Sequence, residues 1–354
     1  MEDVKKFLAE KKGMIDSTIE SYIPRELDEK SIEWMLGKAK YKYNLEAPQK
    51  TIIEPMWEFL DRGGKRWRPA LLLLVNEALG GEPEKIKDLV VIPEVIHNAT
   101  LMHDDIEDGS EMRRGKECTY RIYGMDVAIN LGDVMFFLPY LVLLRNRMGF
   151  DEKTIKKAYD ICIQEMINIC FGQAMDIYWH NGHGDDITEE EYLQMCAYKT
   201  GTLARLSAKL GALFAGADEK IVEKLGDLAE SIGVAFQIQD DILNILPRSQ
   251  DWGKEVGDDI KEGKRSLMVI HTLRNGNDED RRRIIEILDK PEKSEEEIME
   301  AIEILKRNGS VDYARECARR IVREAWAEAD KILPESSAKR HLAAFAQYLI
   351  ERDV

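Results

Sequence analysis

Apolar residues recur at helical spacing along most of the chain, and this pattern predicts an all-α protein. Where the signal strengthens, near residue 51, the apolar positions are Ile52, Ile53, Met56 and Leu60. That period is typical of one face of a helix. The same period predicts long helices over residues 125–147, 153–179, 189–215 and 219–246, and no strand-like alternation runs longer than five residues.

Glycine, proline and capping residues predict where these helices begin and end. Residues 63–64 and 80–83, rich in glycine, break the helical pattern, and Pro69 opens the helix between them, as proline favours a first turn. Pro93 must either kink the next helix or restart it. Thr188 with Glu191 forms the sequence signature of a capping box.

The helical pattern predicts one domain over residues 1–354, a bundle whose central helices are apolar nearly all round. Residues 1–50 are highly charged and are expected to form a weakly packed N-terminal helical extension. Residues 51–271 form the core that carries the motifs, and residues 272–354 predict amphipathic C-terminal helices.

Composition narrows the function classes. The net charge of −16 argues against a nucleic-acid partner. Five cysteines without CxxC spacing indicate reduced thiols rather than disulfides or zinc ligands. The N-terminus lacks an apolar signal segment, and the longest apolar runs, residues 69–75 and 135–144, are shorter than a membrane span. We therefore expect a cytoplasmic protein that does not span a membrane.

A crowded acidic element ends the apolar run of residues 89–102. Asp104 and Asp108 share a helix face, and Asp105 lies just beside it. Clustered carboxylates suit Mg²⁺, which takes its remaining ligands from water and substrate phosphate. Arg113 and Arg114 follow closely and are suited to holding that phosphate. Taken alone, the cluster also fits an ordinary solvated helix end.

A second acidic doublet, Asp240 and Asp241, ends another apolar helix. Two such elements could face each other across a cavity and hold a metal–diphosphate, whereas one alone is a weak signal. Residues 63–69 add three cations at a glycine turn that leads into a helix N-terminus, where an anion is favoured. This stretch lacks the P-loop spacing. Lys199 lies in an apolar helix, where snorkelling to solvent is the ordinary explanation.

In this order, the motifs resemble those of the trans-isoprenyl diphosphate synthases, the polyprenyl synthetase family. Residues 104–108 match the family's DDxxD, residues 63–69 its GGKxxRP, and residues 97–105 its HxxxLxHDD region. Lys199-Thr200, Phe236-Gln237 and residues 254–264 match the later blocks, so that the resemblance covers residues 51–271.

The resemblance implies the isoprenoid synthase fold, with long helices around a central cavity, in a homodimer. It implies that three Mg²⁺ ions are bound with the diphosphate by Asp104, Asp105, Asp108, Asp240 and Asp241. It assigns the allylic substrate (dimethylallyl, geranyl or farnesyl diphosphate) to Arg113, Lys199, Thr200, Gln237, Lys254 and Lys264. It assigns isopentenyl diphosphate to Lys65, Arg68, His97 and Arg114. Asp104, Asp105, Asp240 and Lys199 are the catalytic candidates.

The implied chemistry accounts for these residue types. Cleavage of the allylic C–O bond leaves pyrophosphate and a carbocation, so negative charge develops on the leaving group. Cationic groups stabilise it where it develops. The double bond of isopentenyl diphosphate, held nearby, attacks the cation, and a proton is then lost. No serine or cysteine nucleophile is required.

The chain departs from the family pattern at a few positions. Asn244 stands where many members have Asp in the second acidic motif, Glu117 and Cys118 replace the frequent Pro and Thr or Ser, and Glu255 replaces a frequent Pro. None of these changes removes a group that the chemistry needs.

Product length should depend on the residues just before the first motif. Thr100 and Ala99 lie four and five residues before Asp104, and neither is aromatic; in the family an aromatic residue there tends to stop growth at farnesyl length. The expected product is therefore geranylgeranyl diphosphate or longer, with Ile96 as the next obstacle.

Two other classes of protein share part of the pattern. A class I terpene cyclase also uses DDxxD, but neither Asp240-Asp241 nor Asp185-Asp186 continues into its second metal motif. A non-catalytic subunit of a heteromeric synthase usually loses an acidic motif, whereas both motifs persist here apart from Asn244.

Overall fold

The computed structural model describes residues 2–184, 186–246 and 256–351. Its chain divides into two compact units, Met1–Asp160 with Leu210–Ala217, and Ile161–Lys209 with Asp218–Val354. Helices make up nearly all of both units, and a two-stranded hairpin, β1 (Met112–Arg113) with β2 (Lys116–Glu117), is the extended structure within the described residues. The predicted all-α class is thereby confirmed, while its arrangement as one domain stays a prediction.

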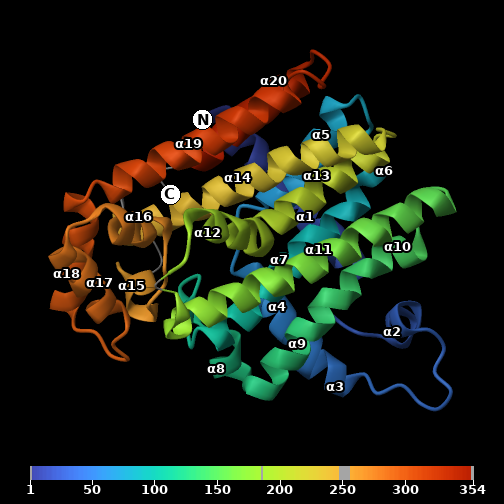
Figure 1. Cartoon of the computed structure of the whole chain (residues 1–354). Helices are drawn as coiled ribbons and strands as arrows, with labels where there is room; N and C mark the ends of the chain where they lie inside the picture. Colours follow the sequence, from blue (N-terminus) through green and yellow to red (C-terminus); the bar gives the residue numbers. More distant parts are fainter. Residues whose placement is uncertain (1, 185, 247–255, 352–354) are drawn as a thin grey trace. The chain divides into compact units, whose positions relative to one another are not determined.

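The first unit is built from short and medium helices (Figure 1). They are α1 (Glu2–Tyr22), α2 (Glu29–Leu36), α3 (Glu46–Pro48), α4 (Glu54–Asp61), α5 (Trp67–Ala78), α6 (Pro83–Ile86), α7 (Val91–Glu107), α8 (Thr119–Tyr123), α9 (Met125–Phe137) and α10 (Leu141–Arg145). A π turn precedes α4 at Gln49–Ile53, and 3-10 turns occupy Lys87–Val90 and Leu138–Tyr140.

The second unit contains the longer helices and the C-terminal layer. Helices α11 (Glu152–Tyr178) and α13 (Thr202–Phe214) pass through both units. The others are α12 (Glu189–Cys196), α14 (Glu219–Ile245), α15 (Asp258–Glu262), α16 (Leu267–Asn275), α17 (Asp278–Leu288), α18 (Glu295–Arg307), α19 (Ser310–Ala329) and α20 (Ser337–Glu351), with π turns at Trp179–His183 and Ala197–Gly201.

Helix α1 packs more firmly than its charged sequence predicts. Ile15 and Ile19 are fully buried, and Tyr22 donates a hydrogen bond to Asp88 at 2.6 Å. The predicted weak packing of residues 1–50 is therefore wrong for this helix. The apolar residues of α1 are few, but they lie on one face of the helix. Because lysine and glutamate dominate the rest of the helix, its overall composition does not indicate a buried face.

Two prolines decide where helices are interrupted. Pro93 lies in the first turn of α7, so the helix restarts there rather than kinking. Pro139 lies in the 3-10 turn Leu138–Tyr140, which divides the long helix predicted over residues 125–147 into α9 and α10. The predicted capping box is confirmed: Thr188 Oγ1 accepts from the backbone of Glu191, and the Glu191 carboxylate accepts from the backbone of Thr188.

One stretch, Met125–Arg145, is long and apolar enough to cross a membrane by length and composition. This stretch is longer than the apolar run of residues 135–144, because α9 and α10 continue each other through the 3-10 turn. A core helix of a soluble protein passes the same test, and 44% of the most apolar window is buried inside the structure.

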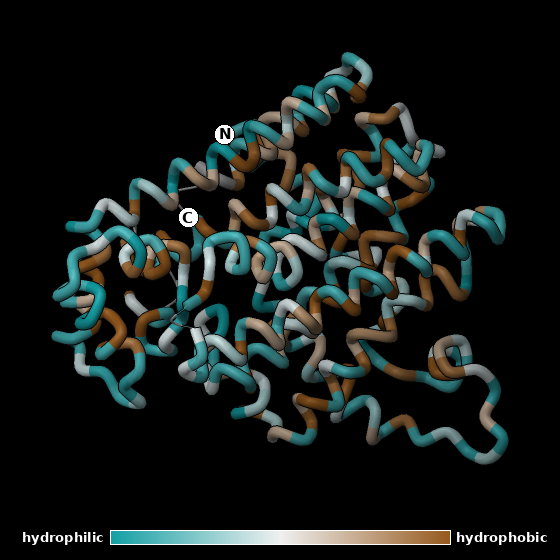
Figure 2. Tube along the Cα trace, viewed as in Figure 1, coloured by the Kyte–Doolittle hydropathy of each residue, from teal (hydrophilic) through white to brown (hydrophobic). Residues whose placement is uncertain are grey.

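Helix α14 is the centre of the second unit. It is buried along most of its length, and α19 and α20 pack along it (Figure 1). Helices α17 and α18 pack together with α15 and bury their isoleucine and leucine residues. Figure 2 shows hydrophilic and hydrophobic residues alternating along these C-terminal helices, as expected for amphipathic elements.

Candidate active site

The open face of α7 carries the first acidic motif. Half-buried positions recur three and four residues apart along it: His97, Thr100, Leu101, Asp104 and Asp108. Ala99 is fully buried on the other side of the helix, and Ile96, one turn before Thr100, is also fully buried. The structure therefore separates the chain-length candidates, with Thr100 on the same face as Asp104 and Ala99 in the packed core.

Asp105 is held by Arg113 of the β-hairpin. Arg113 Nε donates to Asp105 Oδ1 at 2.7 Å, and its Nη2 lies 3.6 Å from Asp104 Oδ2. Burial raises the pKa of Asp105 despite the opposing charge of Arg113, because desolvation disfavours the carboxylate. The thiol of Cys118, the unusual residue of this loop, lies against Asp105, and burial with that negative charge raises its pKa to about 12.

The carboxylates of this motif suit a hard cation. Asp105 Oδ2 is buried and receives no hydrogen bond from the described residues, so one oxygen is available beside the half-buried Asp104 and Asp108. Within the described part of the chain, no three acidic, histidine or cysteine side chains converge as a ready-made metal group. The oxygen chemistry of Asp104, Asp105 and Asp108 fits Mg²⁺, which commonly takes one or two carboxylates and completes its shell with water and phosphate.

The cationic turn between α4 and α5 is shaped by two glycines. Gly63 and Gly64 have φ of 97° and 136°, which disfavours other residues. Beyond them, Arg68 is 7% exposed, lies 4.4 Å from the centre of the Trp67 ring and has a buried Nε without a hydrogen-bond partner among the described residues. Burial lowers the pKa of Arg68 to about 10. Lys65 is exposed.

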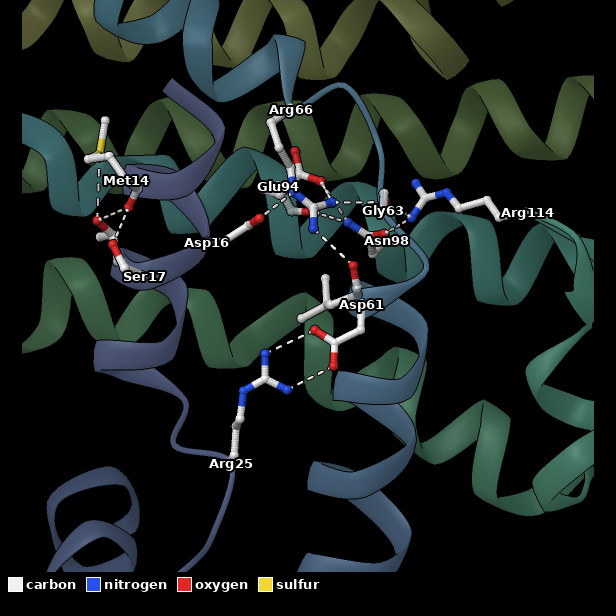
Figure 3. A network of polar contacts seen from close by, with 12 residues as sticks. Met14, Asp16, Ser17, Arg25, Asp61, Gly63, Arg66, Glu94, Asn98 and Arg114 are labelled. Carbon is white, nitrogen blue, oxygen red and sulfur yellow. Dashed lines mark hydrogen bonds and ion pairs between the residues drawn. The ribbon is translucent and has the colours of Figure 1, made fainter. Parts of the chain in front are cut away.

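Arg114 and His97 lie beside the same cationic turn. Arg114 Nη1 donates to Gly63 O at 2.6 Å and to Asn98 Oδ1 at 3.1 Å (Figure 3). Burial and neighbouring arginines lower the pKa of Arg114 to about 10. The pKa of His97 is lowered by burial and by the positive charges of Arg68 and Arg114, so its imidazole is neutral near pH 7. The positive charges of Arg68 and Arg114 repel each other and are partly removed from water, so binding of an anion between them is favourable.

In the second unit, Lys199 and Thr200 lie on the π turn Ala197–Gly201. Two glycines let neighbouring helices reach this turn. A Cβ on Gly172 of α11 would lie 2.3 Å from the backbone nitrogen of Lys199, and one on Gly233 of α14 would lie 2.6 Å from the Cα of Gly201. Such π turns often mark functional sites, and this one is held by backbone-to-backbone contact on two sides.

A chain of hydrogen bonds connects this turn to the second acidic motif. Thr200 Oγ1 donates to Gln237 Oε1 at 2.8 Å, and Gln237 Nε2 donates to Asp241 Oδ1 at 2.8 Å. The hydroxyl of the buried Tyr192 donates to Asp241 Oδ2 at 2.7 Å. Burial, together with the charge of Asp259, raises the pKa of Asp241 to about 7. Asp240 is half-buried beside it.

The lysines of this unit have acidic partners. Lys199 Nζ forms an ion pair with Asp176 of α11, and Lys264 Nζ lies 2.5 Å from Glu262 and 3.8 Å from Asp259. Lys254, predicted to contact the allylic substrate, lies outside the described residues, and so does Glu255.

Asn244, the departure in the second motif, supports the backbone. It is 1% exposed, and its Oδ1 accepts from the backbone N–H of Asp259 at 3.2 Å. Its own carbonyl accepts from Gly257 N at 3.0 Å. This contact requires an acceptor oxygen and not a negative charge, so the amide of Asn244 makes it.

Several residues that support the site received no role in the sequence analysis: Asp16, Arg66, Glu94, Asn98, Asp176 and Tyr192. Glu94 and Asp176 could have been identified from the sequence, because each is an acidic residue within an apolar helix, where a buried carboxylate requires a partner. Asp16 and Tyr192 carry no such signal.

Comparison with known proteins identifies the family. The polyprenyl synthetase model matches residues 49–305. The chain belongs to the polyprenyl synthetase family. It is a prenyl diphosphate synthase, and the cyclase alternative is not supported. Enzymes of this family use Mg²⁺.

Relatives in archaea are similar along nearly their whole length. The chain is 37% identical over 303 residues to a short chain isoprenyl diphosphate synthase of Methanothermobacter thermautotrophicus, covering 86% of this chain and 91% of the relative. It is 35% identical over 309 residues to a geranylfarnesyl diphosphate synthase of Natronomonas pharaonis, with coverages of 83% and 87%. A geranylgeranyl pyrophosphate synthetase structure from Pyrococcus horikoshii matches with a TM-score of 0.85 at 33% identity, covering 99% of both chains.

The contact between Gly172 and the π turn gives a direct test. Gly172→Ala places a methyl group against the backbone of Lys199, and we expect it to destabilise the fold by about 1–3 kcal/mol and to lower kcat. Thermal unfolding and steady-state turnover measure both effects. Gly13→Ala is the control, because Gly13 lies in α1 with nothing within 4 Å of a built Cβ. Unchanged melting and turnover for Gly172→Ala would contradict this packing.

Proposed function

We propose that this enzyme condenses isopentenyl diphosphate with an allylic diphosphate to give an all-trans prenyl diphosphate. Lys65, Arg68, His97 and Arg114 bind the diphosphate of isopentenyl diphosphate. Arg113, Lys199, Thr200, Gln237, Lys254 and Lys264 contact the allylic substrate. Both acidic motifs contribute metal ligands: Asp104, Asp105, Asp108, Asp240 and Asp241.

The observation that carries this proposal is the set of buried cations in the first unit. Arg68 and Arg114 have pKa values of about 10 in place of 12.5. Such a difference corresponds to roughly 3 kcal/mol of unfavourable electrostatics for each guanidinium. A diphosphate bound beside them relieves that cost and supplies an acceptor for the unpartnered Nε of Arg68.

The second unit suits the ionisation of the allylic substrate. Lys199 is paired with Asp176, which fixes its ammonium on the π turn. Thr200 and Gln237 are already oriented by their mutual hydrogen bond. Groups held in this way stabilise developing charge on a leaving group without having to reorganise. The proton lost from the coupled product is taken by the released pyrophosphate.

Three Mg²⁺ ions are the expected number. Bound at the acidic motifs, they would act as Lewis acids and offset the negative charge of the departing pyrophosphate. The buried, unsatisfied Oδ2 of Asp105 supports this role. Asp241, held by Tyr192 and Gln237, offers a second oriented carboxylate. Arg113 keeps Asp105 in place until the cation binds.

An assay with radiolabelled isopentenyl diphosphate and each allylic primer, with and without Mg²⁺, tests the activity. We expect Mg²⁺-dependent product. We expect Arg68→Gln to raise the KM for isopentenyl diphosphate about tenfold or more, because a charge-assisted contact is lost, with little change in the KM for the allylic primer. A protein without activity on any primer would favour the alternative of a non-catalytic subunit.

The half-buried Thr100 is the stronger determinant of product length. It lies one helical turn before Asp104 on the same face of α7, and neither it nor Ala99 is aromatic. Geranylgeranyl diphosphate or a longer product is therefore expected, in keeping with relatives named for geranylgeranyl and geranylfarnesyl products. Ile96 is fully buried one turn deeper.

Two phenylalanine substitutions test this assignment by product chromatography and thermal melting. Thr100→Phe should shorten the main product to farnesyl length while the melting temperature stays near wild type, because Thr100 is only half-buried. Ala99→Phe should also lower the melting temperature, since Ala99 is 0% exposed and overpacking is destabilising. Identical products from Thr100→Phe and wild type would refute the role of Thr100.

A homodimer is proposed from an apolar stripe on α11. Ile163, Ile167, Phe171 and Tyr178 are 55%, 49%, 66% and 59% exposed. Their spacing places them along one side of the helix, and exposed apolar stripes of this kind usually mark protein interfaces. The second copy of the chain would cover them. No nucleic-acid partner is proposed, and the enzyme is expected to be cytoplasmic.

Light scattering coupled to gel filtration tests the dimer. Wild type should have about twice the 40.7 kDa mass of one chain, and the double variant Ile167→Glu/Phe171→Glu should be monomeric, because two buried charges oppose association. Lys157→Glu, an exposed change on the same helix, is the control and should remain dimeric. A monomeric wild type would exclude the interface.

A further inference from the structure

Arg66 lies within the cationic motif but has its donors committed to the protein. Its Nε donates to Asp16 Oδ1 at 2.8 Å, its Nη1 to Glu94 Oε1 at 2.8 Å and to Gly63 O at 3.2 Å, and its Nη2 to Leu60 O at 2.9 Å (Figure 3). The side chain is 3% exposed. Arg66 therefore acts on the turn around it and not as a ligand of the substrate.

The contacts of Arg66 extend to Arg114. Gly63 O accepts from both guanidinium groups. Asn98 joins them by a second route, because its Nδ2 donates to Glu94 Oε1 at 2.9 Å while its Oδ1 accepts from Arg114. The two arginines thus share one carbonyl and, through Asn98, one buried carboxylate. Through these shared partners, the position of Arg66 is coupled to that of Arg114.

The backbone makes this turn sensitive to its anchors. Arg66 has φ of 51°, in the left-handed region, which is strained for a residue other than glycine. A Cβ on Gly64 would lie 3.1 Å from Arg66 Nη1 and 3.4 Å from Arg114 Nη2. The turn therefore keeps its shape only while Arg66 is held in place.

Asp16 supplies one of those anchors from outside the catalytic core. Asp16 lies on α1, next to the fully buried Ile15. The family model begins only at residue 49, so α1 lies outside the matched region. The charges of Glu94 and Asp16 together raise the pKa of Arg66 despite its burial. Glu94 alone would have to serve Arg66 and Asn98.

We propose that the N-terminal helix α1 positions the binding site for isopentenyl diphosphate, with Asp16 acting through Arg66 on Gly63 and Arg114. Asp16 is a positioning residue and does not touch the substrate. The inference rests on the proposed function of Arg68 and Arg114. It makes α1 a working part of the site, because the loss of one carboxylate on α1 loosens a turn that holds a substrate-binding arginine.

The same region offers a matched control. Arg25, just after α1, pairs with Asp61 of α4 through two contacts, Nη1 to Oδ2 at 2.8 Å and Nη2 to Oδ1 at 2.9 Å (Figure 3). Its guanidinium also lies 4.1 Å from the centre of the Trp57 ring. This second tether joins the N-terminal segment to α4, but it makes no contact with Arg66 or Arg114 among the described residues.

Steady-state kinetics of the full-length enzyme test the proposal with Asp16→Asn, Asp16→Glu and Arg25→Gln. Asp16→Asn should raise the KM for isopentenyl diphosphate about fivefold or more, since small misplacements of positioning groups are costly, with the allylic KM and kcat within about twofold of wild type. Asp16→Glu, which keeps the charge, should restore part of the affinity. Arg25→Gln should lower the melting temperature without changing either KM.

Three results would overturn the proposal: an unchanged KM for isopentenyl diphosphate in Asp16→Asn, an equal rise in both KM values, or the same rise in Arg25→Gln. If Asp16→Asn does not fold, Asp16→Glu takes its place: its longer side chain should still raise the KM for isopentenyl diphosphate, by less than about fivefold but more than Arg25→Gln does, and a KM equal to that of Arg25→Gln would overturn the proposal. Arg68→Gln distinguishes a failure of the proposed anion site from a failure of the role proposed for α1. If it also leaves the KM for isopentenyl diphosphate unchanged, the proposed anion site is wrong. If it raises that KM while Asp16→Asn does not, only the role of α1 fails.

Discussion

The buried ion pair between Arg66 and Glu94 is the interaction on which the first unit's site depends. Both side chains are less than 5% exposed, and burying an isolated charge is very costly. Their pairing neutralises two charges and pins the positive-φ turn at residues 63–66. Beside this pair, Arg68 keeps a buried Nε without a hydrogen-bond partner among the described residues, and Arg114 is held by Gly63 and Asn98.

The second unit reaches a similar degree of preorganisation by different means. Backbone contacts at Gly172 and Gly233 hold the π turn, and neutral donors from Tyr192 and Gln237 hold Asp241. These neutral donors favour the carboxylate form of Asp241 and oppose the burial that raises its pKa. Arg113, by contrast, neutralises the charge of Asp105 through an ion pair. The two acidic motifs therefore differ in the partner that holds the carboxylate: an arginine in the first motif and neutral donors in the second.

The sequence predicts the helices more reliably than their interruptions. Glu219–Ile245 agrees with its predicted range within a residue because its apolar period is uninterrupted. The range predicted over residues 189–215 is instead divided by the π turn at Ala197–Gly201. The extra residue of that turn is stabilised by glycine contacts from α11 and α14, which lie far away in the sequence. The packing of α1 was underestimated for a related reason. Its few apolar residues stabilise the fold because they are buried against other helices, which the sequence of α1 does not reveal.

By itself, the sequence determined the helical class, the family and the chemical types of the site: two aspartate motifs, a cationic glycine turn and a lysine within an apolar helix. Periodicity, turn residues and motif spacing are local, so they can be read without coordinates. Only the tertiary structure decided which cations are already committed. Arg66 and Arg68 are two residues apart and chemically identical, yet one is satisfied by Asp16 and Glu94 and the other retains a buried donor without a partner among the described residues. That difference arises from contacts across 28 and 50 residues of sequence, which no local pattern records.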